Sequence, residues 1–422
     1  MNWLPYLLVI PVLILVQWSV RRALGLIHNV GDEVGYTRCG AQKDPYRPVV
    51  FLRVPFMIWL SKQCHRYSSD PVGRLRMAAS VASSVTIVVS MISAQILGGE
   101  WAAMLIGLLL AFMPGRMILS HHTWPDIWLG LWLSVFCLIL VYPDLPQNLR
   151  AQMLGLVAAL AFMTRFDALL LAPVTGLGLA PMSAWEWIFL LSPTVLVFIV
   201  LSLRNAHRYN IPWPDTTWMF NLMIAADETS QQKASKLLVD EEVFKVAAVW
   251  KELSNKDRYM ATITSLRRLC VWPTRAISGM VLRLWASIGP DSFVLGRLVP
   301  PVGRAYPRIS SRLSGILNVA LVFAFPVFIS ATLMALLVAD QPAAVIIWPT
   351  MAYAVTSLFH NRTRYRQAWL PGAALLLVAT ACTPGFWTTL LSAGSIPKWL
   401  VGIGLAIALI RFRVRSDIPG TS

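Results

Sequence analysis

Residues Met77–Leu97 read MAASVASSVTIVVSMISAQIL, a run that contains no charged side chain. About 20 such residues in a helix span the hydrocarbon core of a bilayer. Comparable runs recur along the chain, and we expect each to form a membrane helix, which gives an all-α polytopic membrane protein of about eleven spans. The expected spans are 3–20, 77–97, 101–119, 124–141, 153–163, 168–179, 185–203, 316–338, 343–359, 369–382 and 399–410.

The composition supports this fold class. Of the 422 residues, 57% are hydrophobic and 13% are charged, and the mean hydropathy is +0.62. A soluble protein carries about 25% charged residues, and the alternating pattern of a membrane β-barrel is absent from the sequence. The net charge of +16 indicates contact with anionic membrane lipids or phosphate. No basic soluble domain offers a nucleic-acid surface, and the five cysteines show no CxxC spacing.

Two long polar segments divide the chain into three parts. Residues 1–203 form a transmembrane module with a first loop at about 21–72, in which VVFLRVPFMIWL (49–60) is typical of an interfacial helix. Residues 204–312 form a large loop, where apolar spacing in 230–253 predicts an amphipathic helix. Residues 313–422 supply the last spans. With the N-terminus in the cytoplasm both loops face outward, against the positive-inside tendency of short loops; an outward Arg cluster that binds phosphate would account for this.

The stretch NVGDEVGY (29–36) places the acids Asp32 and Glu33 beside the first span. A carboxylate next to a bilayer is costly to desolvate, so the position calls for a reason. One interpretation is a solvated acidic loop, and the other is a functional acid pair.

Four segments, in order, resemble the GT-C superfamily of polyprenyl-phosphate-sugar glycosyltransferases, such as protein O-mannosyltransferases and the lipid A aminoarabinose transferase. GDEVGY (31–36) with YRPVVFLRVPFMIW (46–59) resembles an Asp-Glu-x-x-Tyr motif followed by Lys-Pro-Pro-Leu and a Trp. The others are residues 73–132, LGLVAALAFMTRFDALLLAPV (154–174) and FHNRTRYRQAWLPGAALLL (359–377). Arg47 and Arg165 stand where the family usually has Lys, which changes the geometry of phosphate contact.

The resemblance implies inverting, direct displacement on an extracytoplasmic face, with a polyprenyl-phosphate-linked sugar as donor and a lipid, glycan or protein as acceptor. One carboxylate base suffices, because a phosphate leaving group needs no strong acid. Asp32 is the expected base, with Glu33 positioning the acceptor or a cation. The expected phosphate-binding or substrate-binding residues are Arg47, Tyr36, Arg165, Arg364, Tyr365 and His360. A bacterial inner membrane and a cell-envelope glycan product are also expected.

Several of these residues have simpler interpretations. Asp126 begins a span, where the helix dipole stabilises an acidic side chain. A role as a second acid of the functional site is an equal alternative. His121 and His122 near carboxylates suggest a divalent-metal site, although adjacent His residues rarely ligate one ion together. Arg165 can simply pair with Asp167. Arg47 and His360 can be ordinary surface charges at the membrane interface.

Two other classes of protein stay open. A transporter or flippase of a lipid-linked sugar also has many apolar helices and few charges, but it typically carries repeated halves and midplane charges. Here the informative charges sit at span ends, and the halves do not match. A non-catalytic membrane scaffold is the third alternative. The sequence favours the glycosyltransferase.

Overall fold

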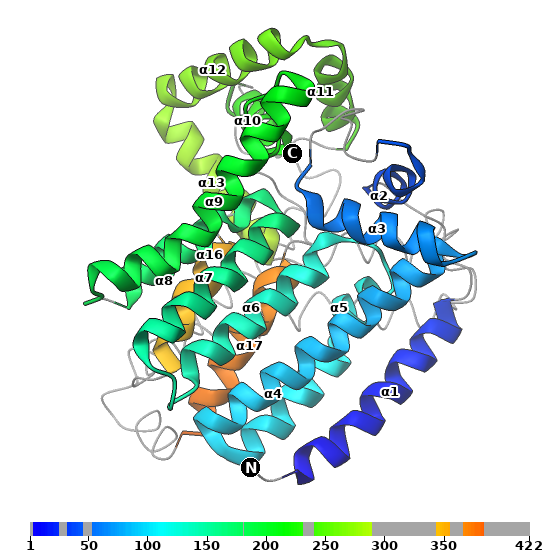
Figure 1. The fold of residues 1–422 in the computed structure, drawn as a ribbon, viewed down its shortest axis with the longest axis vertical. Helices are drawn as coiled ribbons and strands as arrows, with labels where there is room; N and C mark the ends of the chain where they lie inside the picture. Colours follow the sequence, from blue (N-terminus) through cyan, green and yellow to red (C-terminus); the bar gives the residue numbers. More distant parts are fainter. Residues whose placement is uncertain are drawn as a thin grey trace, which may run out of the picture.

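The computed structural model describes residues 3–24, 32–44, 53–179, 181–230, 240–288, 343–354 and 366–383. Every regular element in these ranges is a helix. The helices form an elongated bundle with a smaller group of helices, α10 to α13, stacked on one end (Figure 1). We call α10 to α13 the cap, and residues 32–67, which hold α2 and α3, the first loop.

The bundle contains most of the apolar helices. Its elements are α1 (Leu4–Leu24), α4 (Pro71–Phe112), α5 (Pro114–Leu119), α6 (Pro125–Val141), α7 (Gln147–Thr164), η1 (Phe166–Leu170), α8 (Leu171–Gly178), α9 (Ala184–Tyr209), η3 (Ala343–Ile346), α16 (Ile347–Ala354) and α17 (Arg366–Ala381).

The remaining helices lie at the capped end. The first loop holds α2 (Asp32–Ala41) and α3 (Pro55–Tyr67), and the cap holds α10 (Thr217–Ser230), α11 (Asp240–Glu252), α12 (Asn255–Val271) and α13 (Pro273–Ile288). The expected interfacial helix begins later than its apolar run, because Pro55 occupies the first turn of α3. The expected amphipathic helix is partly described, as α11.

The element α4 is a hairpin of two helices. Gly99, at φ 78° and ψ −165°, breaks the helical backbone in a region that essentially only glycine adopts. The two arms then pack closely, since a Cβ added at Gly107 would lie 2.8 Å from Sδ of Met91 on the other arm. The expected spans 77–97 and 101–119 are these arms, but the second ends at Phe112, where Pro114 starts the separate helix α5.

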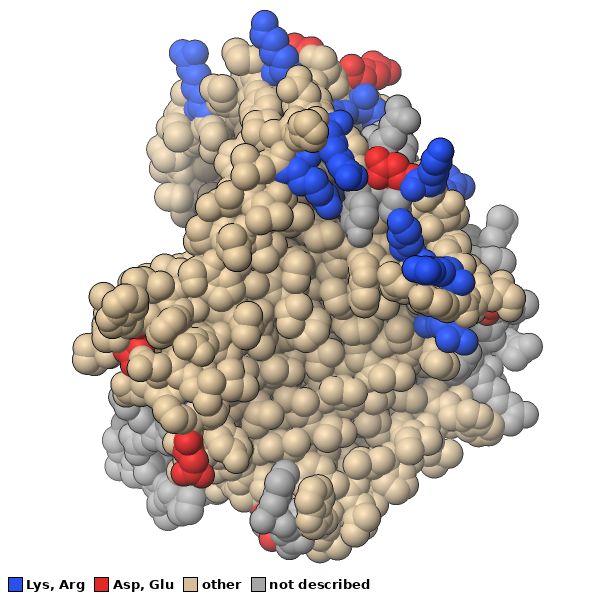
Figure 2. Space-filling model, in the orientation of Figure 1, with Lys and Arg blue, Asp and Glu red and all other residues tan. Residues whose placement is uncertain are grey.

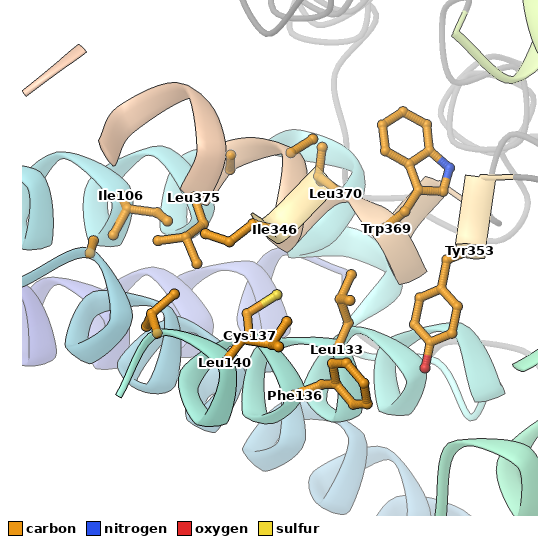
Figure 3. Close-up of a cluster of buried hydrophobic side chains, with 14 of the residues drawn as sticks. Ile106, Leu133, Phe136, Cys137, Leu140, Ile346, Tyr353, Trp369, Leu370 and Leu375 are labelled. Atoms are coloured by element: carbon orange, nitrogen blue, oxygen red, sulfur yellow. The ribbon is translucent and has the colours of Figure 1, made fainter. Parts of the chain in front are cut away.

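The bundle is apolar inside and outside. Ile106 of α4, Phe136 of α6 and Leu375 of α17 meet in one buried cluster (Figure 3). On the outer surface Leu7, Trp101 and Leu196 are 70%, 71% and 62% exposed. Large apolar side chains exposed in such numbers indicate a lipid-facing surface rather than a soluble one.

Two described helices are long and apolar enough to cross a membrane by length and composition, Pro71–Phe112 and Ala184–Tyr209. The first of them is the α4 hairpin. Only 22% of the apolar window of α9 is buried, so most of that helix faces outward. Shorter apolar helices cover Leu4–Ser19, Pro125–Val141, Phe166–Gly178 and Ala368–Ala381. The expected spans 316–338 and 399–410 lie outside the described residues, so the count of about eleven stays a prediction.

Charge is distributed unevenly between the two ends. On the face in Figure 2, Lys and Arg gather over the cap and the first loop, while the bundle below them shows none. Two hydrogen bonds join these charged parts: Tyr209 Oη donates to Asp44 Oδ2 at 3.0 Å, and the amide of Val54 donates to Asp215 Oδ2 at 3.3 Å. The first loop and the start of the 204–312 segment therefore lie at the same end of the bundle.

Candidate functional site

Arg165 lies between two carboxylates at the capped end of the bundle. Its Nη1 is 2.6 Å from Asp126 Oδ1, its Nε donates to Asp167 Oδ1 at 2.9 Å, and its Nη2 is 2.7 Å from Asp167 Oδ2. The contact with Asp167 is the forked, two-bond geometry that favours Arg over Lys. The expected simple pair with Asp167 is present, and Asp126 extends it to a group of three.

Local backbone structure brings these three side chains together. Arg165 is the C-cap of α7 in an extended conformation, and Asp167 lies in the following η1 turn. Asp126 lies in the first turn of α6, next to Pro125. Helices α6 and α7 are joined beside the site by a 2.9 Å hydrogen bond from Trp132 Nε1 to Thr164 Oγ1. The end of α7 and the start of α6 therefore meet at one point.

The group carries a net negative charge in a largely dry environment. Asp126 is 1% exposed, whereas the side chain of Arg165 is 16% exposed. A buried carboxylate has to be paired to stay ionised. Asp126 therefore holds the guanidinium from the buried side, and a small part of Arg165 stays exposed.

A second cation, Arg53, lies just before α3. Its guanidinium carbon lies 4.5 Å above the centre of the Tyr36 ring, on α2. A Cβ added at Gly35 would lie 3.7 Å from Arg53 Nη2, so the guanidinium also covers the α2 backbone. Stacking of this kind fixes the orientation of an arginine without neutralising it.

Asp215 is a buried acid near Arg53 and Asp167. Burial raises its pKa to about 6, and the nearby charge of Asp167 adds to the rise. Hydrogen bonds from Thr217 and the charge of Arg53 act in the opposite direction. The carboxyl group thus feels Arg53 of the first loop and Asp167 of the bundle together, which places both in one electrostatic neighbourhood.

Asp32 and Glu33 are the first two residues of α2. Tyr36 follows Asp32 by four residues, which is about one helical turn. The acid pair therefore begins the helix that carries the ring beneath Arg53. Negative charge at a helix N-terminus is stabilised by the helix dipole. Arg47, His360, Arg364 and Tyr365 lie outside the described residues, and the predictions made for them stay predictions.

The two histidines considered as a divalent-metal site lie beside a hydroxyl group and an aromatic ring. Nδ1 of His121 lies 3.1 Å from Ser80 Oγ, and the ring of His122 stacks on Trp124 with centroids 4.8 Å apart. Over the described ranges, no three His, Cys, Asp or Glu side chains are grouped so that they could hold a metal ion.

Sequence reasoning missed Arg53 and Asp215. Arg53 sits two residues before Pro55, and the helix start that Pro55 fixes is the signal that could have placed it. Asp215, in the sequence WPDTTW, is followed by two Thr residues and accepts the amide of Thr217, a local turn pattern. Its proximity to the first loop depends on a contact between residues 161 positions apart in sequence.

No family model matches the chain, and no curated protein matches it in sequence. Among solved structures it is similar to ArnT from Cupriavidus metallidurans, whose crystal structure holds undecaprenyl phosphate. The sequence identity is 16%, the match covers 90% of this chain and 78% of that chain, and the TM-score is 0.40.

Proposed function

We propose that this chain is an integral membrane glycosyltransferase that moves a sugar from a polyprenyl phosphate to a lipid, glycan or protein acceptor. The observation that carries the proposal is the convergence of Arg165, Asp126, Asp167, Arg53 and Asp215 at the capped end of an apolar bundle, where α2 begins with Asp32. Transfer from a lipid phosphate needs a base and fixed cations at a membrane surface, and the carboxylates and arginines at this end support the proposal.

In this proposal Asp32 removes the proton from the acceptor hydroxyl as its oxygen attacks the anomeric carbon. The bond from that carbon to the phosphate oxygen breaks, and the electron pair leaves with the lipid phosphate. Direct displacement of this kind inverts the anomeric centre. Glu33 positions the acceptor, and Asp126 positions Arg165 rather than touching the sugar.

The proposed phosphate-binding cations are Arg165 and Arg53, both of which are oriented by neighbouring side chains. Preorganised donors of this kind stabilise charge as it develops on a leaving group, and removing one typically costs about 3–4 kcal/mol of barrier. The ring of Tyr36 stacks against the guanidinium of Arg53 and fixes its orientation. The expected contributions of Arg47, His360, Arg364 and Tyr365 belong to the same proposal.

We further propose about eleven spans, with the first loop and residues 204–312 on the periplasmic side of a bacterial inner membrane. The orientation follows from the chemistry, because a cell-envelope acceptor needs a water-exposed surface beside the base. The Lys and Arg residues over the cap and the first loop support a membrane face that attracts phosphate (Figure 2).

The test is turnover of an undecaprenyl-phosphate sugar panel by the purified protein, followed by mass spectrometry. An enzyme releases bare undecaprenyl phosphate, and Asp32→Asn should slow that release by about 10²–10⁴-fold with little change in donor affinity. Glu33→Gln is the matched control, with a smaller loss expected. Arg53→Gln should weaken donor binding and slow departure together.

Two outcomes would contradict the proposal. Lipid moved across vesicles but chemically intact, over a panel containing the true donor, would favour a flippase. Normal release by Asp32→Asn, Glu33→Gln and Asp126→Asn alike would remove the catalytic assignment altogether.

A further inference from the structure

Arg116 is a buried arginine that takes no part in the ion pairs of Arg165. It lies on α5 and is 1% exposed. Its Nη2 donates to the carbonyl oxygen of Ser83 on α4 at 3.3 Å, while Nε and Nη1 have no hydrogen-bond partner in the structure as described. The hydroxyl of Ser83 is buried and equally without a partner.

This combination is unusual for a folded protein. A guanidinium keeps its charge at any ordinary pH, and a buried charge is normally paired. Arg165 shows the usual solution in this chain, with a carboxylate on each side. In the described residues no ion pair joins Arg116 to a carboxylate. An anion bound at this point would supply the counter-charge that the described residues do not.

We propose that Arg116 and Ser83 form a binding site for a phosphate group, which is a separate site that does not depend on the glycosyl transfer proposed above. Two free guanidinium nitrogens and a neighbouring hydroxyl supply several donors to one tetrahedral oxyanion. The group is either the headgroup phosphate of a membrane lipid or free phosphate.

The setting suits a lipid source well. Helix α5 contacts α1, which lies at the edge of the bundle (Figure 1), and Ser120 Oγ, just after α5, donates to Gln17 Oε1 of α1 at 3.1 Å. The outward side chains of α1 are apolar, with Ile14 and Leu15 at 64% and 60% exposure. Acyl chains can lie along such a surface while their phosphate reaches a basic pocket between helices.

The experiment compares bound phosphorus in three purified proteins: wild type, Arg116→Gln and the control Arg150→Gln. Arg150 also donates to a backbone carbonyl, that of Tyr142, but on an exposed part of α7. Wild type and Arg150→Gln should carry about one more phosphate per chain than Arg116→Gln. After the protein is denatured, phosphorus extracted into organic solvent identifies a lipid, and phosphorus left in water identifies the free ion.

A second measurement covers the case in which Arg116→Gln does not fold. Delipidated wild type and Ser83→Ala are titrated with inorganic phosphate and with phosphatidylglycerol, and the shift of the unfolding temperature is followed. Ser83→Ala should bind the effective ligand about tenfold more weakly, because one donor to a charged group is lost. Equal phosphorus in all three proteins, or equal titrations of wild type and Ser83→Ala, would overturn the proposal and leave water as the occupant.

Discussion

At the scale of single residues, the ion pairs of Arg165 govern both stability and the proposed chemistry. Asp126 is buried and Asp167 is more exposed, so the two carboxylates are not equivalent. Water cannot replace the buried contact between Arg165 and Asp126, whereas it can partly replace the more exposed contact between Arg165 and Asp167. The difference gives a stability prediction that is independent of any activity assay.

Arg165→Gln leaves Asp126 buried without its cation and should destabilise the protein by about 3–5 kcal/mol. Asp126→Asn in the same background removes the stranded charge and should recover most of that loss. Thermal unfolding of the two single variants and the double variant in one detergent measures the coupling. Strictly additive losses would mean that the 2.6 Å contact carries no net energy.

Asp215 gives a pH prediction. Its pKa is raised to about 6 in the folded protein, so the folded state binds the proton more tightly than the unfolded state. The stabilisation is complete below about pH 4 and is lost as the pH rises through 6. Asp215→Asn cannot ionise, so its stability relative to wild type should increase by about 2 kcal/mol from pH 4.5 to pH 7.5.

The measurement is the difference in unfolding temperature between Asp215→Asn and wild type across that pH range. Asn210→Ala is the control, because it changes the neighbouring end of α9 without changing a titrating group. If the Asp215→Asn difference were as flat with pH as the Asn210→Ala difference, the carboxyl group would not titrate in this range.

At the scale of helices, most of the architecture follows from the sequence. Runs of apolar residues predicted the helices α1, α6 and α9, because membrane-length helices depend mainly on composition, whereas α7 begins earlier than its apolar run and the next run divides into η1 and α8. The predicted helix boundaries were wrong where a proline intervenes. Pro55 makes α3 begin later than its apolar run, and Pro114 separates α5 from the second arm of α4. The hairpin itself depends on the non-helical backbone at Gly99, and the hydrophobic periodicity of the sequence does not reveal this break.

Alanine substitutions at two glycines of α4 should destabilise the protein for different reasons. A Cβ at Gly99 would meet nothing within 4 Å, so Gly99→Ala costs backbone strain alone, about 1–3 kcal/mol. Gly107→Ala instead places a methyl group against Met91 and Val9. Adding Met91→Ala should relieve part of the Gly107→Ala loss and none of the Gly99→Ala loss, as read from unfolding temperatures. Equal relief of both would show that Gly99 is also limited by packing.

At the scale of the whole molecule, the capped end carries the candidate site. The sequence singled out Asp126 and Arg165 as candidate site residues, each with a simpler structural alternative, and the structure joins them in an ion pair that both interpretations allow. The meeting of Arg53 and Asp215 was not predicted, because the contact between the first loop and the α9–α10 connection joins residues 161 positions apart in sequence. Contacts between distant segments leave little trace in a single sequence, whereas span ends are marked by composition.

The proposed orientation predicts which face of the membrane exposes the cap. Cys270 of α12 is the exposed cysteine among the five, and a membrane-impermeant thiol reagent should label it from outside sealed vesicles. A cysteine placed at Asp144, between α6 and α7 at the other end, should label from inside, and Cys270→Ser is the background control. Labelling of Cys270 from the cytoplasmic side would invert the topology and move the candidate site with it.

The α4 hairpin also has a consequence for biosynthesis. Its arms are consecutive in the chain, and many of its hydroxyl groups bond within their own helix: Ser84 to Ser80, Thr86 to Ala82 and Ser93 to Val89. These groups need no later partner, so the hairpin can leave the translocation machinery for lipid before α6 is synthesised. The hydroxyl of Ser90 differs, because it donates to Ser134 of α6 and gains this partner only when that later helix packs against the hairpin.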